Sequence, residues 1–343
     1  MRLQPPILSA LGAAVLFGAS TPAAKLLAGD LHPVLLAGLL YAGSGIGLAA
    51  TLVVRGKRVA LPSAGDWPWL AAAIFCGGIL GPILLMTGLK DTPAANASLL
   101  LNLEGVLTAL IAWFAFRENF DRRIAAGMAL IVAGGALLAV EPGAAYRVDG
   151  GAIAVAGACF AWALDNNFTR RVSAADAAGI AALKGLCAGA ANLALAWWLG
   201  ARWPGPGSAL AAAATGWLRY GVSLALFVVA LRELGAARTG AYFSSAPFVG
   251  VGLSLAVLGE SPAPQFWGAA ALMLVGVWLH VSERHEHEHV HEPMEHEHAH
   301  VHDEHHQHGH APGTGPEPHT HLHKHDRLVH RHPHYPDIHH QHH

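Results

Sequence analysis

Long apolar runs separated by short polar breaks dominate the first 280 residues of this 343-residue chain. A helix that crosses the ~30 Å hydrocarbon layer of a membrane needs about 20 mainly apolar residues. The start of the chain resembles a signal peptide, but its apolar run is too long for one, so we assign it to a first membrane helix. The pattern predicts an all-α polytopic membrane protein with ten transmembrane helices. The predicted spans are 7–28, 33–54, 67–88, 93–116, 122–140, 151–169, 176–199, 212–231, 236–258 and 264–282.

The apolar part also contains an internal duplication. The segment GLKDTPAANASLLLNLEGVLTALIAWFAFRE (88–118) aligns without a gap on ALRELGAARTGAYFSSAPFVGVGLSLAVLGE (230–260), at an offset of 142 residues. Five helices per copy is an odd number, so the copies enter the membrane from opposite sides. The sequence therefore predicts an inverted-topology repeat, with one copy in 1–140 and the other in 150–282. The offset matches Ala94 with Ala236, Ala95 with Ala237, Glu118 with Glu260 and Gly134 with Gly276.

Basic residues predict the orientation, because cytoplasmic loops carry an excess of Lys and Arg. With the N-terminus in the cytoplasm, the opposite loops contain only Lys90, Arg147 and Arg202. An even number of spans then places both termini in the cytoplasm, and we expect a multi-pass protein of the inner (cell) membrane. The cytoplasmic segments would contain Arg2, Arg55, Lys57, Arg58, Arg117, Arg122, Arg123, Arg170, Arg171, Arg232, Arg238 and Arg284.

The C-terminal segment has a different composition from the rest of the chain. Residues 281–343 hold 23 of the 25 histidines, with 11 acidic and 4 basic residues, for a formal charge of −7. The other 280 residues hold 17 basic and 12 acidic residues, for +5. We predict that 283–343 forms a disordered, His-rich cytoplasmic tail. The three cysteines lie in apolar runs without paired spacing, which favours buried thiols over metal ligands or disulfides.

Three segments carry a resemblance to a known family. TPAANASLLLNLEGVLTALIAWFAFRE, its partner YFSSAPFVGVGLSLAVLGE, and FGASTPAAKLL near the start are similar to the EamA-type drug/metabolite transporter superfamily. The resemblance covers about residues 7–280 and implies ten helices, cytoplasmic termini, and export or exchange of small polar metabolites. Gly105 departs from the family pattern, in which a proline usually follows the glutamate of the first copy, whereas the second copy keeps Pro247.

Polar side chains inside the predicted spans are candidates for a substrate site, because charge in the bilayer interior is costly and usually faces a cavity or a partner. Glu104, Asp165 and Lys184 lie deepest, and we expect Lys184 to pair with Asp165 or Glu104. Lys25 lies near a helix end and can also reach the surface. Structural roles remain open alternatives, since polar groups in membrane helices often bond a neighbouring helix. The candidate substrate-binding residues are Asn102, Glu104, Trp162, Asp165, Asn166, Lys184, Asn192, Tyr242 and Ser245.

The tail has the chemistry of a metal-binding segment. Tracts such as HEHEHVH place several imidazoles within reach of one ion, and neutral imidazole is a good ligand for zinc, nickel, cobalt and copper. No fixed zinc-finger spacing is present, so we expect several weak, interchangeable sites. A pH-responsive charge switch and simple solvation are the alternatives. The candidate ligands are His285, His287, His289, His291, His296, His298, His300, His302, His305, His306, His308 and His310.

These features favour a secondary transporter that works by alternating access on a small polar solute, with a cytoplasmic metal-binding tail that regulates it. A variant makes a divalent transition metal or its chelate the cargo. An alternative of another class is a membrane-anchored metal buffer or sensor, although an anchor would not need charges inside its helices. The chain shows no nucleotide-binding Gly-rich loop, so we expect neither an enzyme nor a required cofactor. The expected partners are the bilayer, the solute and metal ions, not nucleic acid, and either a monomer or a dimer fits the sequence.

Overall fold

The computed structural model describes most of the apolar part of the chain and four segments of the tail. The chain divides into two compact units, Met1–Glu283 and Arg284–His340, and each is described by itself. The described residues are 5–29, 31–56, 63–116, 122–140, 149–172, 177–227, 229–230, 239, 242–281, 286–291, 294–300, 319–325 and 328–333.

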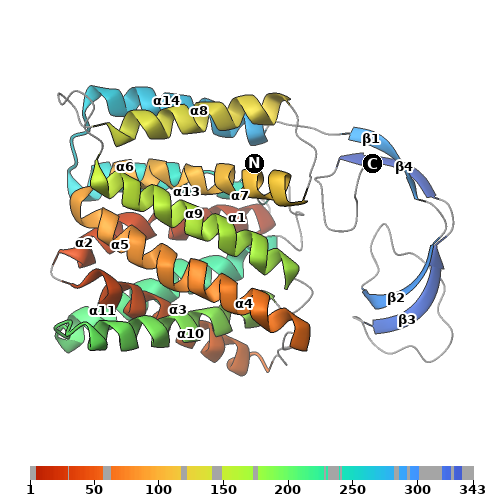
Figure 1. The fold of residues 1–343 in the computed structure, drawn as a ribbon, viewed down its shortest axis with the longest axis horizontal. Helices are drawn as coiled ribbons and strands as arrows, with labels where there is room; N and C mark the ends of the chain where they lie inside the picture. Colours follow the sequence, from red (N-terminus) through yellow and green to blue (C-terminus); the bar gives the residue numbers. More distant parts are fainter. Residues whose placement is uncertain are drawn as a thin grey trace. The chain divides into compact units, whose positions relative to one another are not determined.

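The first unit is built of helices (Figure 1). Proline and glycine set several of their ends. Pro33 and Pro206 each stand in the first turn, where a missing N–H costs nothing, and Gly200 and Gly259 adopt positive φ just after a helix. The elements are α1 Pro5–Gly18, α2 Ser20–Ala28, α3 Pro33–Val54, η1 Ala64–Asp66, α4 Trp67–Ala73, η2 Ile74–Leu80, α5 Gly81–Asp91, α6 Ala94–Leu100, α7 Asn102–Phe116, α8 Arg122–Ala139, α9 Gly150–Arg171, α10 Ala177–Trp198, α11 Pro206–Gly216, η3 Trp217–Val222, α13 Ala246–Leu258 and α14 Pro264–Val281.

Seven helical stretches in the described part of the chain are long and apolar enough to cross a membrane. Consecutive elements run together in some of them, so that α4, η2 and α5 form one stretch. Helix α13 and the apolar part of α14, Pro264–Leu279, are shorter, and α9 carries Asp165, Asn166 and Asn167 in its second half. The count of ten spans therefore stays a prediction. The seven stretches are Pro5–Ala28, Pro33–Val54, Trp67–Asp91, Ala94–Ile111, Arg122–Ala139, Ala178–Trp198 and Pro206–Phe227.

Irregular backbone recurs at matching places in the two halves. Both η2 and η3 are π-helical. Subtracting the offset of 142 from the η3 range 217–222 gives 75–80, which lies inside η2. The break between α6 and α7 is at Leu101, and the same offset places it at 243, next to the turn at 244–245 that precedes α13. These interruptions follow the sequence duplication.

The helices pack closely where small residues face one another. Figure 1 shows α3 lying beside α10 and α8 beside α14. A Cβ atom added at Gly45 would lie 2.4 Å from the backbone nitrogen of Leu186, so α3 and α10 approach to backbone contact. The matched pair Gly134 and Gly276 serves the other interface, where each glycine meets the facing helix. In a membrane the lipid tails are as apolar as the helices, so helices associate through close van der Waals packing, which small residues allow.

Three charged side chains hold the turn between α5 and α6. The Lys25 ammonium donates to the backbone carbonyls of Leu89, Lys90 (3.1 Å) and Thr92 (3.0 Å), and so caps the end of α5. The Glu260 carboxylate accepts from the first two amides of α6, at 2.7 and 2.8 Å. Asp149 accepts from the Thr92 hydroxyl at 3.1 Å. Lys25 and Glu260 therefore have structural partners, while Glu118, the match of Glu260, lies outside the described residues.

The second unit contains four short strands, β1 Glu286–His291, β2 Met294–His300, β3 His319–His325 and β4 Leu328–Pro333. β1 pairs with β4 and β2 pairs with β3, both antiparallel. The helical unit agrees with the predicted all-α fold, and the disordered tail stays a prediction. The strict alternation of histidine with other residues has a period of two, which is the period of a strand.

We expect Gly43→Ala to destabilise the helical unit by roughly 1–3 kcal/mol, the typical cost of overpacking. The added Cβ would lie 2.1 Å from the Ala213 carbonyl oxygen, between α3 and α11. Gly252→Ala in α13 is the matched control, because its Cβ would meet no atom within 4 Å. The measurement is the thermal unfolding midpoint of both purified variants in one detergent. Equal midpoints would contradict the close approach of α3 to α11.

Candidate functional site

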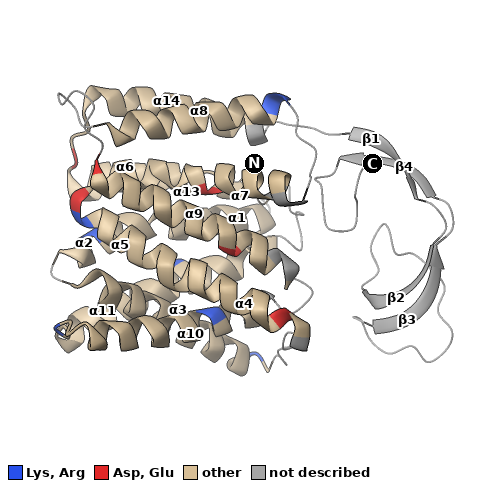
Figure 2. Cartoon of the chain, in the orientation of Figure 1, with Lys and Arg blue, Asp and Glu red and all other residues tan. Residues whose placement is uncertain are grey.

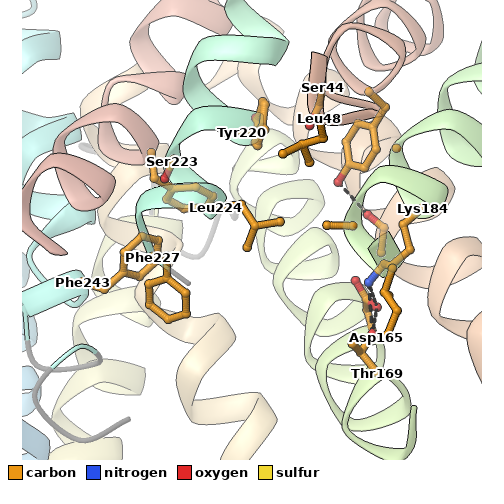
Figure 3. Close-up of a pocket in the computed structure, with 16 residues that line it drawn as sticks. Ser44, Leu48, Asp165, Thr169, Lys184, Tyr220, Ser223, Leu224, Phe227 and Phe243 are labelled. Atoms are coloured by element: carbon orange, nitrogen blue, oxygen red, sulfur yellow. Dashed lines mark hydrogen bonds and ion pairs between the residues drawn. The ribbon is translucent and has the colours of Figure 1, made fainter. Parts of the chain in front are cut away.

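A cavity of about 420 Å³ lies within the helical unit (Figure 3). Its walls come from segments far apart in the sequence, including α1, α3, α9, α10 and η3. Most of the surrounding helical residues carry no charge (Figure 2), so charged groups in the wall are notable. The lining residues are Phe17, Tyr41, Ser44, Leu48, Gly77, Asp165, Thr169, Ile180, Ala181, Lys184, Gly185, Tyr220, Ser223, Leu224, Phe227 and Phe243.

An ion pair forms one end of the cavity. The Lys184 ammonium on α10 donates to the Asp165 carboxylate on α9, and the two side chains are 17% and 11% exposed. Thr169, one turn after Asp165, donates its hydroxyl to the same carboxylate oxygen at 2.8 Å and lies 3.1 Å from the ammonium. The sequence prediction that Lys184 pairs with Asp165 or Glu104 is confirmed for Asp165. The pair leaves this end polar but without net charge.

The π-helical segment η2 shapes the wall beside the ion pair. A π turn widens the helix and lets carbonyl groups turn toward neighbouring side chains. The Gly77 carbonyl accepts from the Tyr41 hydroxyl and from the Trp162 indole nitrogen, both at 2.9 Å. A Cβ atom at Gly77 would lie 1.8 Å from an oxygen of Asp165, so only glycine leaves room for the carboxylate here.

Aromatic rings line the cavity from the wall beside the ion pair to the opposite end, where Phe227 and Phe243 lie in Figure 3. Five rings follow one another in contact, with centroid separations between 4.8 and 6.1 Å. Such separations are typical of edge and tilted aromatic packing. The cavity therefore has a polar, charge-balanced end and an apolar end. The rings, in order of contact, are Tyr41, Tyr220, Phe17, Phe243 and Phe227.

The structure separates the predicted Glu104 site from the cavity. Glu104 accepts from the Asn166 side-chain amide at 2.9 Å, and the same amide lies 3.2 Å from the Thr108 hydroxyl. These residues join α7 to α9, and none of them is among the cavity-lining residues. Asp165 and Asn166 are neighbours in sequence, but only Asp165 reaches the cavity. The predicted cluster thus divides into two polar groups on α9.

The other predicted site residues bond to nearby backbone. Asn192 donates to the Gly78 carbonyl at 2.8 Å, and Asn102 donates to the Leu99 carbonyl at 2.9 Å. The Ser245 hydroxyl donates to the Tyr242 carbonyl at 2.6 Å, at the start of α13. Trp162 contributes through Gly77, as described above. None of these five residues lines the cavity.

Several cavity residues were not candidates from the sequence. Tyr41 and Ser44 are three residues apart and share one face of α3, and this spacing could have identified both as candidates from the sequence. If a small gap is allowed in the alignment of the two copies, Phe17 falls opposite Trp162, which was a second signal. Arg219, in η3, is a cation inside a predicted span and was not among the candidate residues. Its guanidinium donates to the Ala19 carbonyl at 2.5 Å, between α1 and α2.

The predicted metal ligands are not tested by this arrangement. In the part of the chain that the structure describes, no group of three or more His, Cys, Asp or Glu side chains is arranged to hold a metal ion. His287, His289 and His291 lie in β1, and His296, His298 and His300 lie in β2. The remaining candidates fall outside the described residues: His285, His302, His305, His306, His308 and His310.

Comparison with known proteins decides the family. The pattern of the EamA-like transporter family matches residues 4–140 and 149–282, which together make up most of the chain. The chain belongs to the EamA-like transporter family. As a member it is a multi-pass membrane protein. The family match falls into two segments of similar length.

Relatives and a solved structure resemble this EamA-like protein over different lengths. An "Uncharacterized transporter" of Methanothermobacter thermautotrophicus is 27% identical over 290 residues, 79% of this chain and 84% of the relative. The "Probable 4-amino-4-deoxy-L-arabinose-phosphoundecaprenol flippase subunit ArnE" of Pseudomonas aeruginosa is 40% identical over 111 residues, 31% of this chain and 93% of ArnE. Both names describe transport, not catalysis. A protein of known crystal structure shares the fold, with a TM-score of 0.59 and 23% identity over 80% of this chain and 96% of its own.

We expect Asp165 and Lys184 to be coupled in stability. Asp165→Asn and Lys184→Met should each destabilise the protein, since each leaves a partly buried charge without its partner, by less than the about 3–5 kcal/mol typical of a fully buried pair. The double variant should be more stable than the sum of the single effects predicts. Thermal unfolding of the four proteins measures the coupling, with Lys90→Met as the control for an exposed lysine. Strict additivity would contradict the ion pair.

Proposed function

We propose that this EamA-like protein is a secondary transporter of a small polar solute that works by alternating access. Ten helices in two inverted five-helix repeats would form the body, with both termini in the cytoplasm. The observation that carries the proposal is the cavity, which holds an ion pair among apolar helices. A purely structural protein has no need of a hollow of about 420 Å³ with charged groups in its wall.

The matched irregularities of the backbone support the repeat. The π-helical segments η2 and η3 are related by the same offset as the sequence duplication, and both border the cavity. Gly134 and Gly276, paired by that offset, lie on opposite sides of the α8–α14 interface. Two halves of like structure that enclose one site suit rocking of one half against the other.

The relatives support transport more than they support a particular cargo. One relative, similar over 84% of its length, is named as a transporter, and the match to ArnE, a flippase subunit, spans 111 residues, which is shorter than one of the two repeats. We carry over only the movement of a polar group across a membrane. The solute, the direction and the coupling ion follow from neither name.

We further propose that the histidine-rich tail binds divalent transition metals and regulates the transporter. Its 23 histidines supply many neutral imidazole ligands in an acidic segment. The tail follows the last helix, so a bound ion would act on the cytoplasmic side and not in the cavity. Metal as the cargo remains the competing role, and the experiments below separate the two.

Transport is tested by measuring which solutes cells accumulate or release with and without the protein, in the presence and absence of zinc, nickel or cobalt. We expect the cellular level of a small polar solute to change when the protein is present.

The Glu104→Gln variant should insert into the membrane normally but reduce that change several-fold. The reason is the position of Glu104 just after the break at Leu101, where its charge must be matched when the helices move. Asp91→Asn, at an exposed helix end, is the control. Full activity of Glu104→Gln would remove this carboxylate from the mechanism.

Deletion of residues 285–343 should leave membrane insertion and basal transport intact while removing metal binding and any metal response. Titration calorimetry of the full chain with Zn²⁺, Ni²⁺, Cu²⁺ and Co²⁺ is the measurement. Imidazole must be neutral to bind a metal, so affinity should be present above pH ~6.5 and fall as the pH drops below it. Absence of binding at neutral pH, or loss of basal transport in a well-inserted truncation, would contradict this role.

A further inference from the structure

We propose that histidines standing opposite each other in the strand pairs of the second unit are its metal sites, with one divalent transition-metal ion to each facing pair, and that the bound ions fix the register of the strands. The inference rests on the proposed metal binding of the tail and names its ligands and their arrangement. Ten of the twelve histidines in the four described strands (Figure 1) stand opposite another histidine. The facing pairs are His287 with His332, His289 with His330, His296 with His323, His298 with His321, and His300 with His319.

One common register accounts for all five facing pairs. The two residue numbers of every pair have the same sum in β1–β4 and in β2–β3, so the two ladders continue one antiparallel hairpin. Histidine occupies odd-numbered positions in β1 and even-numbered positions in β2, and the partner strands make the matching change, even in β4 and odd in β3. A shift of one residue in either direction would leave each of these ten histidines opposite a residue of another type. Two tracts that alternate independently have no reason to change at matching points.

Directly opposite positions of an antiparallel pair suit one shared metal ion. The Cβ atoms of two such residues are about 4.5–5.5 Å apart, and zinc lies about 2.0–2.1 Å from each imidazole nitrogen that binds it. Residues two apart on a strand belong to the same side of a sheet, so the facing pairs of one ladder form a row of sites. A facing pair supplies two imidazole ligands and leaves the other coordination positions to water, and nickel and copper accept such mixed nitrogen and oxygen ligands.

Charged residues between the histidines favour the same register. Glu288 stands opposite Arg331 in β1–β4, and Glu295 stands opposite Lys324 in β2–β3. Opposite charges in directly facing positions stabilise an antiparallel pair, by roughly 0.2–1 kcal/mol each on the usual scale. Each ladder therefore has one charge pair that selects the register in which its histidines face each other.

The shared register links the sites to one another. An ion bound by one facing pair holds the two strands together and raises the effective concentration of the remaining facing histidines. A tail without this register would instead offer independent ligands, any of which could replace another. The two arrangements differ in whether metal orders the backbone and in whether the position of a lost histidine matters.

Hydrogen exchange of the backbone amides in the purified full-length protein tests whether metal fixes the strands. At neutral pH, with Ni²⁺ at about 100 times its dissociation constant, exchange in 294–300 and 319–325 should slow at least about tenfold relative to the metal-free protein. Mg²⁺ at the same concentration is the control, because it prefers oxygen ligands and should leave the exchange rates unchanged. Binding of Ni²⁺ without slower exchange in these strands would overturn the proposal.

Three double variants, each lacking two histidines, separate facing pairs from interchangeable ligands. His298→Ala with His321→Ala removes one whole pair and should lower the Ni²⁺ capacity, measured by calorimetry, by one ion per chain. His289→Ala with His298→Ala breaks two pairs and should lower it by two. His291→Ala with His325→Ala is the matched control, since these two histidines stand opposite Leu328 and Met294, and it should leave the five paired sites intact. Equal losses in all three variants would show that the histidines are interchangeable and that the pairing is not the site.

The outcomes separate this inference from the proposed metal binding of the tail. If Ni²⁺ binds but the three double variants lose the same capacity, the facing pairs fail and metal binding by the tail stands. If the full-length protein binds no Ni²⁺, the proposed metal binding fails, and the facing pairs fail with it. The hydrogen-exchange measurement needs no substitution, so it decides the register even where a variant is poorly produced.

Discussion

A charge placed among apolar helices must find a counter-charge or hydrogen-bond partners within the protein, and this requirement organises the centre of the molecule. Losing one partner of a buried pair costs about 3–5 kcal/mol, a large part of the stability of a typical protein. The Asp165–Lys184 pair meets the requirement by joining α9 to α10 at the cavity wall. The cavity can remain hollow because the charges that border it satisfy each other.

The same requirement applies to the backbone. Where η2 departs from regular α-helical geometry, side chains from α3, α9 and α10 bond the carbonyls of Gly77 and Gly78. At the break between α1 and α2, Arg219 bonds the Ala19 carbonyl. Irregular backbone is tolerated at such depth only where neighbouring groups satisfy it. The cavity therefore lies where helices are interrupted and where their freed carbonyls have been taken up by polar side chains.

The sequence predicted the helices well because apolar runs of this length have few other uses. It also predicted the Asp165–Lys184 pair, since charges inside such runs are rare and must be matched. The predicted first and last residues of the helices were less accurate. Helix α11 begins at Pro206 and not near 212, because Gly205 and Pro206 form a favourable start for a helix.

The sequence predicted less reliably which side chains face the cavity. Asn192 shares a helical stripe with Lys184, but it lies eight residues further along, about 12 Å at the helical rise, and reaches Gly78 instead of the cavity. The aromatic end went unnoticed because aromatic residues in membrane helices more often pack or anchor than bind. A π-helical turn also changes which face the following residues occupy, and no simple spacing rule reveals its presence.

The cap on α6 has a consequence for the order in which the chain is assembled. The first two amides of α6 are satisfied by Glu260, which follows them by 166 and 165 residues. During synthesis the ribosome therefore completes the whole first repeat, and nearly all of the second, before this carboxylate exists. Until then the start of α6 has two amides without their final acceptor. The first half of the protein can insert as it emerges, but this turn reaches its final bonded state only near the end of translation.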